Sequence, residues 1–171
     1  ARLALLAEYD LDLNWRDIRG FLGRLDEAGT ALNYATFVGH GTLRAAAMGF
    51  GNRPPSAAEL ERMKVFVGEA MGGGALGLSS GLEYTPGSFA STEELIELCR
   101  VAARNGGVYA THMRDEETGI LEAVDEAFRI ARETPIRLQI SHLKIGYAVN
   151  WPKFPALLDR LERARAAGVE F

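Results

Sequence analysis

Three histidines are the residues of this sequence best suited to chemistry at neutral pH, and each follows a short hydrophobic segment. His40 follows YATFVG, His112 follows VYAT and His142 follows LQIS. Neutral imidazole nitrogens bind metals, and they exchange protons near pH 7. If the three segments are parallel strands, all three histidines lie at the carboxyl ends of those strands, which is the edge where α/β proteins bind ligands.

His112 and His142 follow consecutive predicted strands and therefore form the strongest candidate pair. Neighbouring strands lie about 4.8 Å apart. Two imidazoles at that separation can bind one metal ion, because Zn–N distances are about 2.0–2.1 Å. The alternative is that each ring only packs or hydrogen-bonds a carbonyl, and the spacing alone leaves both interpretations open.

The segments around these histidines are typical of buried parallel strands, because they are short and rich in β-branched, aromatic and small residues. Their starts are about 30 to 45 residues apart, which leaves room for a helix and two loops in each gap. The predicted strands are Leu32–Gly39, Ala75–Ser80, Gly107–Thr111 and Ile136–Ser141.

The gaps between these segments have the apolar periodicity of amphipathic helices. Ser56 with Glu59, and Ser91 with Glu94, have the spacing of capping boxes at helix starts. The other predicted helices are Trp15–Ala28, Leu121–Ala131 and Trp151–Ala167, the last followed by Gly168 at its C′ position and by the opening of a fifth strand at Val169–Phe171.

Alternating strands and helices predict an α/β fold, a parallel β-sheet with alternating helices and right-handed crossovers. We interpret this sheet as part of a TIM-like (β/α)8 metallo-hydrolase barrel, with an open doubly wound sheet as the alternative.

Composition restricts the class of protein. The chain has 171 residues, of which 47% are hydrophobic and 25% charged, and this is the profile of one soluble globular domain. The net charge of −4 and the interleaved basic residues argue against nucleic acid as a partner. No apolar run reaches the roughly 20 residues needed to span a membrane. The single cysteine, Cys99, excludes an internal disulfide and favours a cytoplasmic location.

Four stretches together resemble the N-acyl-D-amino-acid deacylases (D-aminoacylases) of the amidohydrolase superfamily. The similarity lies in the order and spacing of the stretches, and it runs from about Trp15 to the C-terminus. The stretches are VGHGTLR (38–44), GALGLSSGLEYTPG (74–87), GGVYATHMRDE (106–116) and QISHLK (139–144).

The resemblance implies roles for four of the residues in these stretches. His112 and His142 match the family's metal ligands, so zinc is the expected cofactor. Lys144 and Tyr84 match residues near the substrate, a small N-acyl amino acid. A cation at Lys144 suits the free carboxylate of such a substrate. The alternative for Lys144 is a solvated surface lysine.

Other polar residues near these motifs have weaker interpretations. Arg114 binds substrate or the active-site rim, or else forms only a local salt bridge. His40 is not a family ligand, so we expect a structural role for it or a supporting contact to the metal ligands. We expect Glu116 and its acidic neighbours in the first turn of a helix, where carboxylates suit the helix dipole, rather than at the metal. Cys99 is expected to be a core residue.

The resemblance also implies groups that this sequence does not contain. In the superfamily an HxH pair lies on the first barrel strand, and a late strand carries an aspartate that acts as general acid and base. We therefore expect residues 1–171 to form a single partial barrel segment that lacks the N-terminal HxH strand and the C-terminal strands. We expect this segment to be inactive alone, and to self-associate or pair with the rest of the parent barrel through its open sheet edges.

Three functions remain open from the sequence. The first is a segment of a zinc-dependent enzyme that hydrolyses the linear amide of N-acyl-D-amino acids. The second is an amidohydrolase acting on cyclic amides or dipeptides. The third is a non-catalytic segment that binds a small acid or a partner chain, and only this third function expects no zinc binding at His112 and His142.

Overall fold

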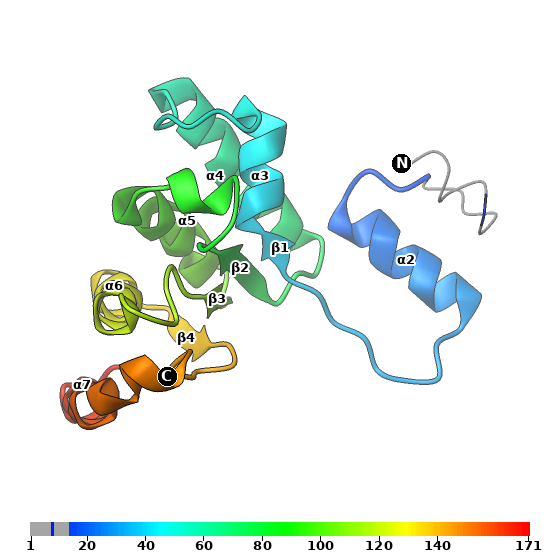
Figure 1. The fold of residues 1–171 in the computed structure, drawn as a ribbon. Coiled ribbons are helices and arrows are strands. Elements are labelled where there is room, and N and C mark those ends of the chain that lie inside the picture. The colour runs from blue at the N-terminus through cyan, green and yellow to red at the C-terminus, as the bar shows by residue number, and fades with distance from the viewer. Residues whose placement is uncertain (1–7, 9–13) are drawn as a thin grey trace.

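A computed structural model describes Glu8 and residues 14–171, and its centre is a four-stranded parallel sheet (Figure 1). The strands are adjacent in sequence order, so each chain crossover joins neighbouring strands. Residues 1–7 and 9–13 of the expected domain lie outside the described residues. The strands are β1 (Val38–Gly39), β2 (Gly77–Gly81), β3 (Val108–His112) and β4 (Arg137–Ile140). This arrangement confirms the predicted α/β fold with a parallel sheet and alternating helices.

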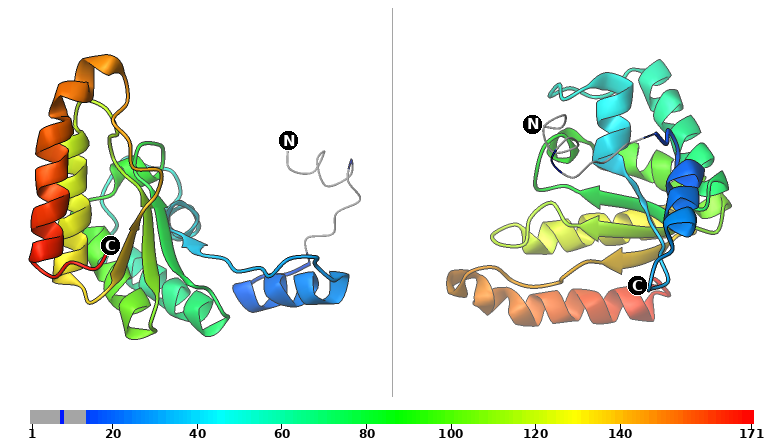
Figure 2. Two further views of the ribbon diagram at one scale, coloured as in Figure 1. Left: turned by 90° about the horizontal axis from the view of Figure 1, so that it is seen from below. Right: turned by 90° about the vertical axis from the view of Figure 1, so that its right-hand side faces the viewer.

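Helices follow every strand, and those after β1 gather on one side of the curved sheet (Figure 2). The helices on the covered side are α3 (His40–Met48), α4 (Ala57–Gly72), α5 (Thr92–Arg104), α6 (Ile120–Glu133) and α7 (Phe154–Ala166), with short 3-10 turns at Gly87–Phe89 and Ala148–Lys153. The helix α2 (Ile18–Ala28) lies beside the end of α4, where the Arg19 guanidinium donates to the Gly72 carbonyl at 2.6 Å, and an extended segment joins it to β1 (Figure 1).

The hydrophobic core lies between the sheet and these helices, and the strand register explains which residues enter it. Leu78 pairs with Tyr109 and Tyr109 with Leu138, so one row of side chains crosses three strands, and all three are buried. Because side chains alternate across a strand, His112 lies on the other face of β3 from Tyr109. Phe128 of α6 is fully buried in the same core, where truncation to alanine costs about 3–5 kcal/mol.

The first predicted strand is wrong over most of its length. Of Leu32–Gly39, only Val38 and Gly39 form a strand, and they pair with Leu78 and Ser79 of β2. The Thr36 carbonyl also accepts from the Leu76 amide, directly before β2. Leu32 is largely exposed and packs in no core. The helix α3, which begins directly at His40, was not predicted.

The C-terminal region departs from the prediction in two smaller ways. A 3-10 turn covers Ala148–Lys153, so α7 begins at Phe154 rather than at Trp151. Val169–Phe171 is not a strand, although the Glu170 carbonyl accepts from the Leu138 amide at 3.0 Å and so extends the sheet edge beside β4. Gly168 has a φ of 81°, as expected for the residue that ends the helix.

One of the two predicted capping boxes forms completely. The Ser56 side chain accepts from the Glu59 amide, and the Glu59 carboxylate accepts in return from the Ser56 amide. At α5, Ser91 accepts from the Glu94 amide, but the Glu94 carboxylate turns away to bind His40 and Arg44. The second box is therefore only half formed, because a buried imidazole and a buried guanidinium bind the carboxylate instead.

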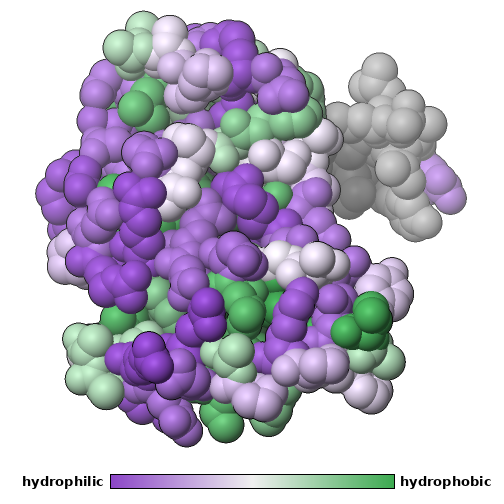
Figure 3. Space-filling view, turned by 60° about the vertical axis from the view of Figure 1, so that its left-hand side comes forward, coloured by the Kyte–Doolittle hydropathy of each residue, from purple (hydrophilic) through white to green (hydrophobic). Residues whose placement is uncertain are grey.

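An apolar groove lies between α7 and the loop after β4. Figure 3 shows hydrophobic side chains gathered in the lower half of the view, the part of the molecule that carries α6, β4 and α7. Lys144 and six apolar residues line a groove of about 350 Å³ there. The apolar residues are Leu143, Ile145, Trp151, Phe154, Leu157 and Leu161. No helix of the described residues is both long enough and apolar enough to cross a bilayer.

Candidate metal centre

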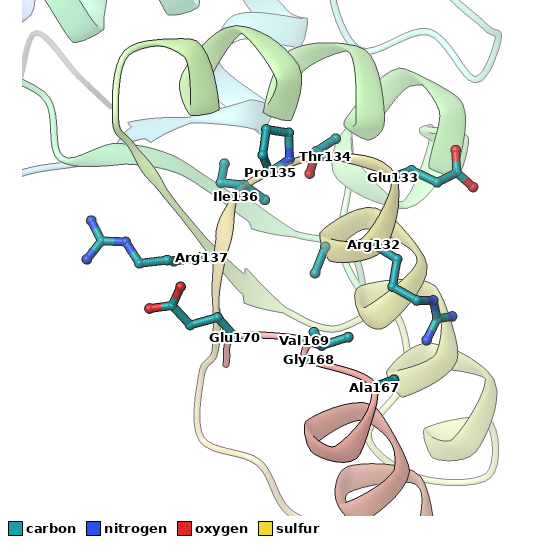
Figure 4. A pocket seen from close by; sticks show the side chains of 11 residues that line it. Arg132, Glu133, Thr134, Pro135, Ile136, Arg137, Ala167, Gly168, Val169 and Glu170 are labelled. Atoms are coloured by element: carbon teal, nitrogen blue, oxygen red, sulfur yellow. The ribbon is translucent and has the colours of Figure 1, made fainter.

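Two of the three histidines meet in a cleft of about 490 Å³ at the carboxyl ends of the strands. Its lining includes His112, His142, Tyr84 and His40. A larger cavity of about 580 Å³ lies around the start of β4, between residues 131–137 and 167–170 (Figure 4). That cavity contains no histidine and lies at the opposite end of the sheet from the histidine pair, so the smaller cleft is the candidate site.

The imidazoles of His112 and His142 lie side by side, as expected from their positions at neighbouring strand ends. Their ring centroids are 4.7 Å apart, and the rings meet edge to face. His112 Nδ1 lies 2.9 Å from His142 Nε2. In a tetrahedral zinc site the ligand atoms stand about 3.3 Å apart, so a shift of a few tenths of an ångström would let one ion bind both nitrogens.

The backbone at His142 explains how its ring reaches this point. The Ser141 amide donates to the Thr111 carbonyl, so Ser141, and not His142, is the residue that continues the sheet opposite His112. His142 then adopts a φ of 41°, in the left-handed region that non-glycine residues seldom occupy. Backbone strain of this kind concentrates at functional sites, and here it turns the imidazole toward His112.

Glu116 is a third potential metal ligand, and its expected position in the first turn of a helix is wrong. The helix α6 begins at Ile120, so Glu116 lies in the preceding loop and not in a first helical turn. Its carboxylate is buried, with Oε1 2.7 Å from His142 Nδ1 and 3.8 Å from His112 Nδ1. The three side chains form a compact group that could hold a metal ion.

The chemistry of this group fits a divalent cation. Glu116 Oε1 is buried yet has no aligned hydrogen bond, although it lies close to two imidazoles. A buried acceptor without a hydrogen bond is unfavourable, and a cation or a repositioned imidazole N–H would satisfy it. Imidazole nitrogen and carboxylate oxygen are both common zinc ligands.

Burial raises the pKa of the Cys99 thiol far above its usual value, so Cys99 remains a protonated core residue.

Lys144 lies at the edge of this group and contacts it through Glu116. Its ammonium donates to Glu116 Oε2, and Nζ is 3.4 Å from His142 Nδ1. The side chain is 56% exposed, so the cation stays accessible to solvent. The structure therefore brings Lys144 together with His142 and Glu116.

Tyr84 lies over His112 on the turn that follows β2. The two ring centroids are 5.5 Å apart, and the tyrosine is exposed. Its hydroxyl packs so closely on Gly81 that any side chain at that position would overlap it. Gly81 thus leaves the space that the tyrosine hydroxyl occupies, and Tyr84 lies beside His112 in the cleft.

Arg114 lies outside this cluster. Its guanidinium makes two hydrogen bonds to the Glu126 carboxylate, both at 2.9 Å, and one each to the carbonyls of Ser88 and Ala90. The hydrogen bonds to Glu126 raise the pKa of Arg114, so the guanidinium stays charged. These contacts join the loop after β3 to α6 and to the segment before α5.

His40 reaches the cleft lining but binds a different set of partners. It is fully buried at the start of α3, and its Nε2 lies 2.8 Å from Glu94 Oε1. Arg44, one turn later, donates to Glu94 Oε2 at 2.5 Å and to the Arg53 carbonyl at 2.5 Å. We call His40, Glu94 and Arg44 the buried ion cluster. The structure separates it from the His112–His142 pair.

The buried ion cluster holds its carboxylate in the charged form. Burial acts to raise the pKa of Glu94, but the hydrogen bonds and charges of His40 and Arg44 outweigh it and lower the pKa below its ordinary value of 4.5. A charged carboxylate balances the guanidinium, and neither is left unpaired.

Two acidic residues that lie beside the histidines are not predicted from the sequence. Glu116 was assigned to a helix start, and Glu83, which lies 2.6 Å from His112 Nε2, was not singled out. Glu83 stands two residues beyond Gly81, and Gly81 pairs with His112 in the sheet register. The register of β2 on β3 places Glu83 beside the histidine, and this register follows from the folded sheet rather than from a local sequence pattern.

Comparison with known proteins identifies relatives along almost the whole chain. No protein-family model matches the sequence. The chain is 39% identical to an N-acyl-D-glutamate deacylase of Alcaligenes xylosoxydans xylosoxydans over 99% of its own length and 34% of that protein. It is 42% identical to a D-aminoacylase of the same organism over 85% of its length and 30% of that protein.

Solved structures show the same relationship in three dimensions. N-acyl-D-glutamate deacylase of Bordetella bronchiseptica, complexed with zinc and a phosphonate inhibitor, matches 90% of this chain and 32% of its own with a TM-score of 0.86 and 38% identity. A D-aminoacylase structure matches 88% of this chain and 32% of its own with a TM-score of 0.83 and 43% identity. The chain thus spans about a third of the length of the relatives it matches.

Proposed function

This chain is a relative of the D-aminoacylases and other N-acyl-D-amino-acid deacylases, and we propose that it forms part of a zinc-dependent amidohydrolase barrel that hydrolyses N-acyl-D-amino acids. In that reaction water adds to the amide carbonyl and the C–N bond breaks, which releases a D-amino acid and a carboxylate. The observation that carries the proposal is the approach of His112 Nδ1 to His142 Nε2, 2.9 Å apart at the carboxyl edge of a parallel sheet.

His112 and His142 would hold the metal, with Glu116 beside them. A bound zinc supplies Lewis-acid chemistry, since it polarises a carbonyl oxygen and lowers the pKa of water. The protein's contribution is to fix both rings before the metal arrives. The strand β3 fixes His112, and the left-handed residue after β4 fixes His142.

Lys144 and Tyr84 would bind the substrate. An N-acyl amino acid carries one free carboxylate and one amide group, and the exposed ammonium of Lys144 suits an anionic group or a polarised carbonyl oxygen. The Tyr84 ring, placed over His112, closes one wall of the cleft. Arg114 is bound to Glu126 and two carbonyls, so its contribution would be to hold the rim rather than to reach the substrate directly.

The chain matches about a third of the length of its relatives. The remaining catalytic groups would come from barrel segments that correspond to the other two thirds. We propose that these groups include the HxH ligand pair and the aspartate that acts as general acid and base. Residues 1–171 would then be one segment of the barrel, with little activity alone. The apolar groove lined by Leu143, Trp151 and Phe154 would pack against the rest of that barrel.

Zinc binding tests the proposal directly. The purified chain, dialysed against zinc and analysed for metal content, is expected to retain the ion, and His112→Ala and His142→Ala are each expected to lower its affinity for zinc at least tenfold. His40→Gln is the matched control, because His40 binds Glu94 and not the pair. Retention of zinc by both alanine variants at wild-type affinity would contradict the proposal and favour a non-catalytic binding segment.

The substrate class needs a separate measurement. The chain would be expressed as part of a complete barrel, and the rate of free amine release would be measured for each substrate class. The substrates are N-acetyl-D-glutamate, N-acetyl-D-leucine, a cyclic amide and a dipeptide. We expect hydrolysis of the N-acetyl-D-amino acids. Faster hydrolysis of the cyclic amide or the dipeptide would overturn the substrate assignment and leave the metal site standing.

A further inference from the structure

The two ring nitrogens of His112 face different groups. Nδ1 faces His142 Nε2 at 2.9 Å, on the side where the proposed metal would lie. Nε2 faces Glu83 Oε2 at 2.6 Å, on the opposite side of the ring. An imidazole bound to a metal uses one nitrogen as the ligand and presents the other as an N–H donor.

The identity of the Glu83 group decides which nitrogen carries the hydrogen. An ionised carboxylate only accepts hydrogen bonds, so a contact of 2.6 Å requires a hydrogen on His112 Nε2. With Nε2 protonated, the neutral ring keeps its lone pair on Nδ1, the nitrogen that faces His142. Glu83 therefore selects the tautomer in which both imidazoles can share one ion.

The same division holds at the second histidine. His142 Nε2 faces His112, and its Nδ1 lies 2.7 Å from Glu116 Oε1. Thus the two inner nitrogens face each other and each outer nitrogen faces a carboxylate. Glu116 also binds Lys144 and is not aligned as a hydrogen-bond acceptor from His142. Of the two carboxylate contacts, only the one from Glu83 to His112 has the geometry of a hydrogen bond.

The position of Glu83 in the chain makes this contact a property of the fold. Gly81 is the last residue of β2 and pairs with His112, and the Leu82 amide donates to the His112 carbonyl at 3.1 Å. The chain is thus anchored to His112 directly before Glu83. Tyr84, the next residue, packs against the same imidazole. Two consecutive side chains therefore contact His112, Glu83 at Nε2 and Tyr84 through its ring.

We propose that Glu83 is a positioning residue that fixes the Nε2–H tautomer and the orientation of His112, so that Nδ1 is the metal-binding atom. This inference rests on the proposed zinc site and adds a role for a residue outside the ligand set. Carboxylates that bind the outer nitrogen of a ligand histidine typically change metal affinity 10- to 100-fold when they are removed.

We expect variants of Glu83 to remain folded. Its side chain is 49% exposed, and it lies in the turn after β2. Exposed ion pairs contribute little to folding, so a loss of zinc affinity in a Glu83 variant would not reflect a loss of structure. Glu117 offers a matched control, because it is a nearby carboxylate that packs against Gly146 rather than against a histidine.

The first experiment measures zinc affinity by competition with a chromophoric chelator for the wild-type chain, Glu83→Ala, Glu83→Gln and Glu117→Ala. We expect a 10- to 100-fold loss for Glu83→Ala. Glu83→Gln keeps an acceptor for the Nε2 hydrogen and should recover part of the loss, while Glu117→Ala should stay within about twofold. Equal affinity of Glu83→Ala and the wild-type chain would overturn the inference while leaving the zinc site intact.

The second experiment identifies the ligand atom. With ¹⁵N-labelled histidine and ¹¹³Cd in place of zinc, we expect metal–nitrogen coupling at Nδ1 of His112 and a retained hydrogen at Nε2. Coupling at Nε2 would overturn the inference. A chain that binds neither metal would refute the proposed zinc site, and the ¹⁵N spectrum of that metal-free chain would still test Glu83, because a hydrogen on Nδ1 rather than Nε2 contradicts its role.

Discussion

Two histidine environments lie beside one cleft, and they differ in burial and in partners. His40 is fully buried and binds Glu94, whose second oxygen binds Arg44. The side chains of His112 and His142 are 22% and 48% exposed, and their nitrogens face each other. His40 shares a buried carboxylate with a guanidinium, which suits a structural role, whereas the two imidazoles in the cleft need to separate by only a few tenths of an ångström to bind one ion.

The difference also separates stability from function. Removing one member of a buried ion pair leaves the other charge buried without a partner, which is strongly unfavourable. Removing an imidazole from the open cleft exposes its neighbours to water and leaves no buried charge unpaired at that position. We therefore expect the buried ion cluster to control folding and the His112–His142 pair to control metal binding.

The largest effect is expected from Arg44→Met. The substitution keeps most of the volume but removes the guanidinium from Glu94 and from the Arg53 carbonyl. We expect a loss of about 3–5 kcal/mol in the free energy of unfolding, measured by urea denaturation of the metal-free chain.

Arg163→Met is the matched control for that substitution. Arg163 is exposed and pairs with Asp159 four residues earlier on α7, and such pairs contribute only about 0.3–0.5 kcal/mol. Equal destabilisation by the two variants would show that the buried ion cluster has no special role in folding.

A direct comparison of histidines comes next in size. His40→Ala is expected to cost about 2–4 kcal/mol in the metal-free chain, because it opens a cavity beside Glu94 and removes one of its hydrogen bonds. His142→Ala is expected to cost less than about 1 kcal/mol, since its ring is half exposed. Thermal unfolding followed by circular dichroism ranks the two, and the reverse order would invalidate the distinction between these environments.

Zinc should reverse the ranking of the two sites. Since a ligand that binds only the folded state stabilises it by RT ln(1 + [L]/Kd), zinc at a hundred times its Kd adds about 2.7 kcal/mol. We expect this gain in the wild-type chain and in Arg44→Met where that variant remains folded, but not in His142→Ala. A zinc-dependent gain in His142→Ala equal to that of the wild-type chain would place the ion elsewhere.

The smallest effect is the acid dependence of the buried ion cluster. The pKa of Glu94 is lower in the folded chain than its ordinary 4.5, so the unfolded state binds the proton more readily. The stabilisation is therefore complete above pH 4.5 and is lost as the pH falls below it. Urea denaturation between pH 7 and pH 3 should show a shallower acid loss in Glu94→Gln than in the wild-type chain, and parallel curves would contradict this assignment.

The sequence predicts much of the fold and, within the candidate site, the two histidines but not their acidic neighbours. Apolar periodicity with Ser caps locates α4 and α5, apolar periodicity alone locates α6, and hydrophobic runs locate β2, β3 and β4. Strand ends then predict the approach of His112 to His142. These features depend on local pattern and on the common direction of parallel strands, and both can be read from the residues.

The positions of the acidic residues depend on contacts between distant segments. Glu94 has the spacing of a capping residue, yet it binds His40, which is 54 positions away. Glu116 reaches His142 across two loops that are joined by the hydrogen bond from the Gly146 amide to the Glu116 carbonyl. Glu83 requires the exact register of β2 on β3. No local pattern carries that information.

X-ray absorption of the zinc-loaded chain tests the central claim most directly. We expect a shell of nitrogen and oxygen ligands at about 2.0–2.1 Å, with scattering from two imidazoles that falls to one in His142→Ala and in His112→Ala. A spectrum with sulfur ligation, or with two imidazoles retained in either variant, would contradict the assignment of His112 and His142 as the metal ligands.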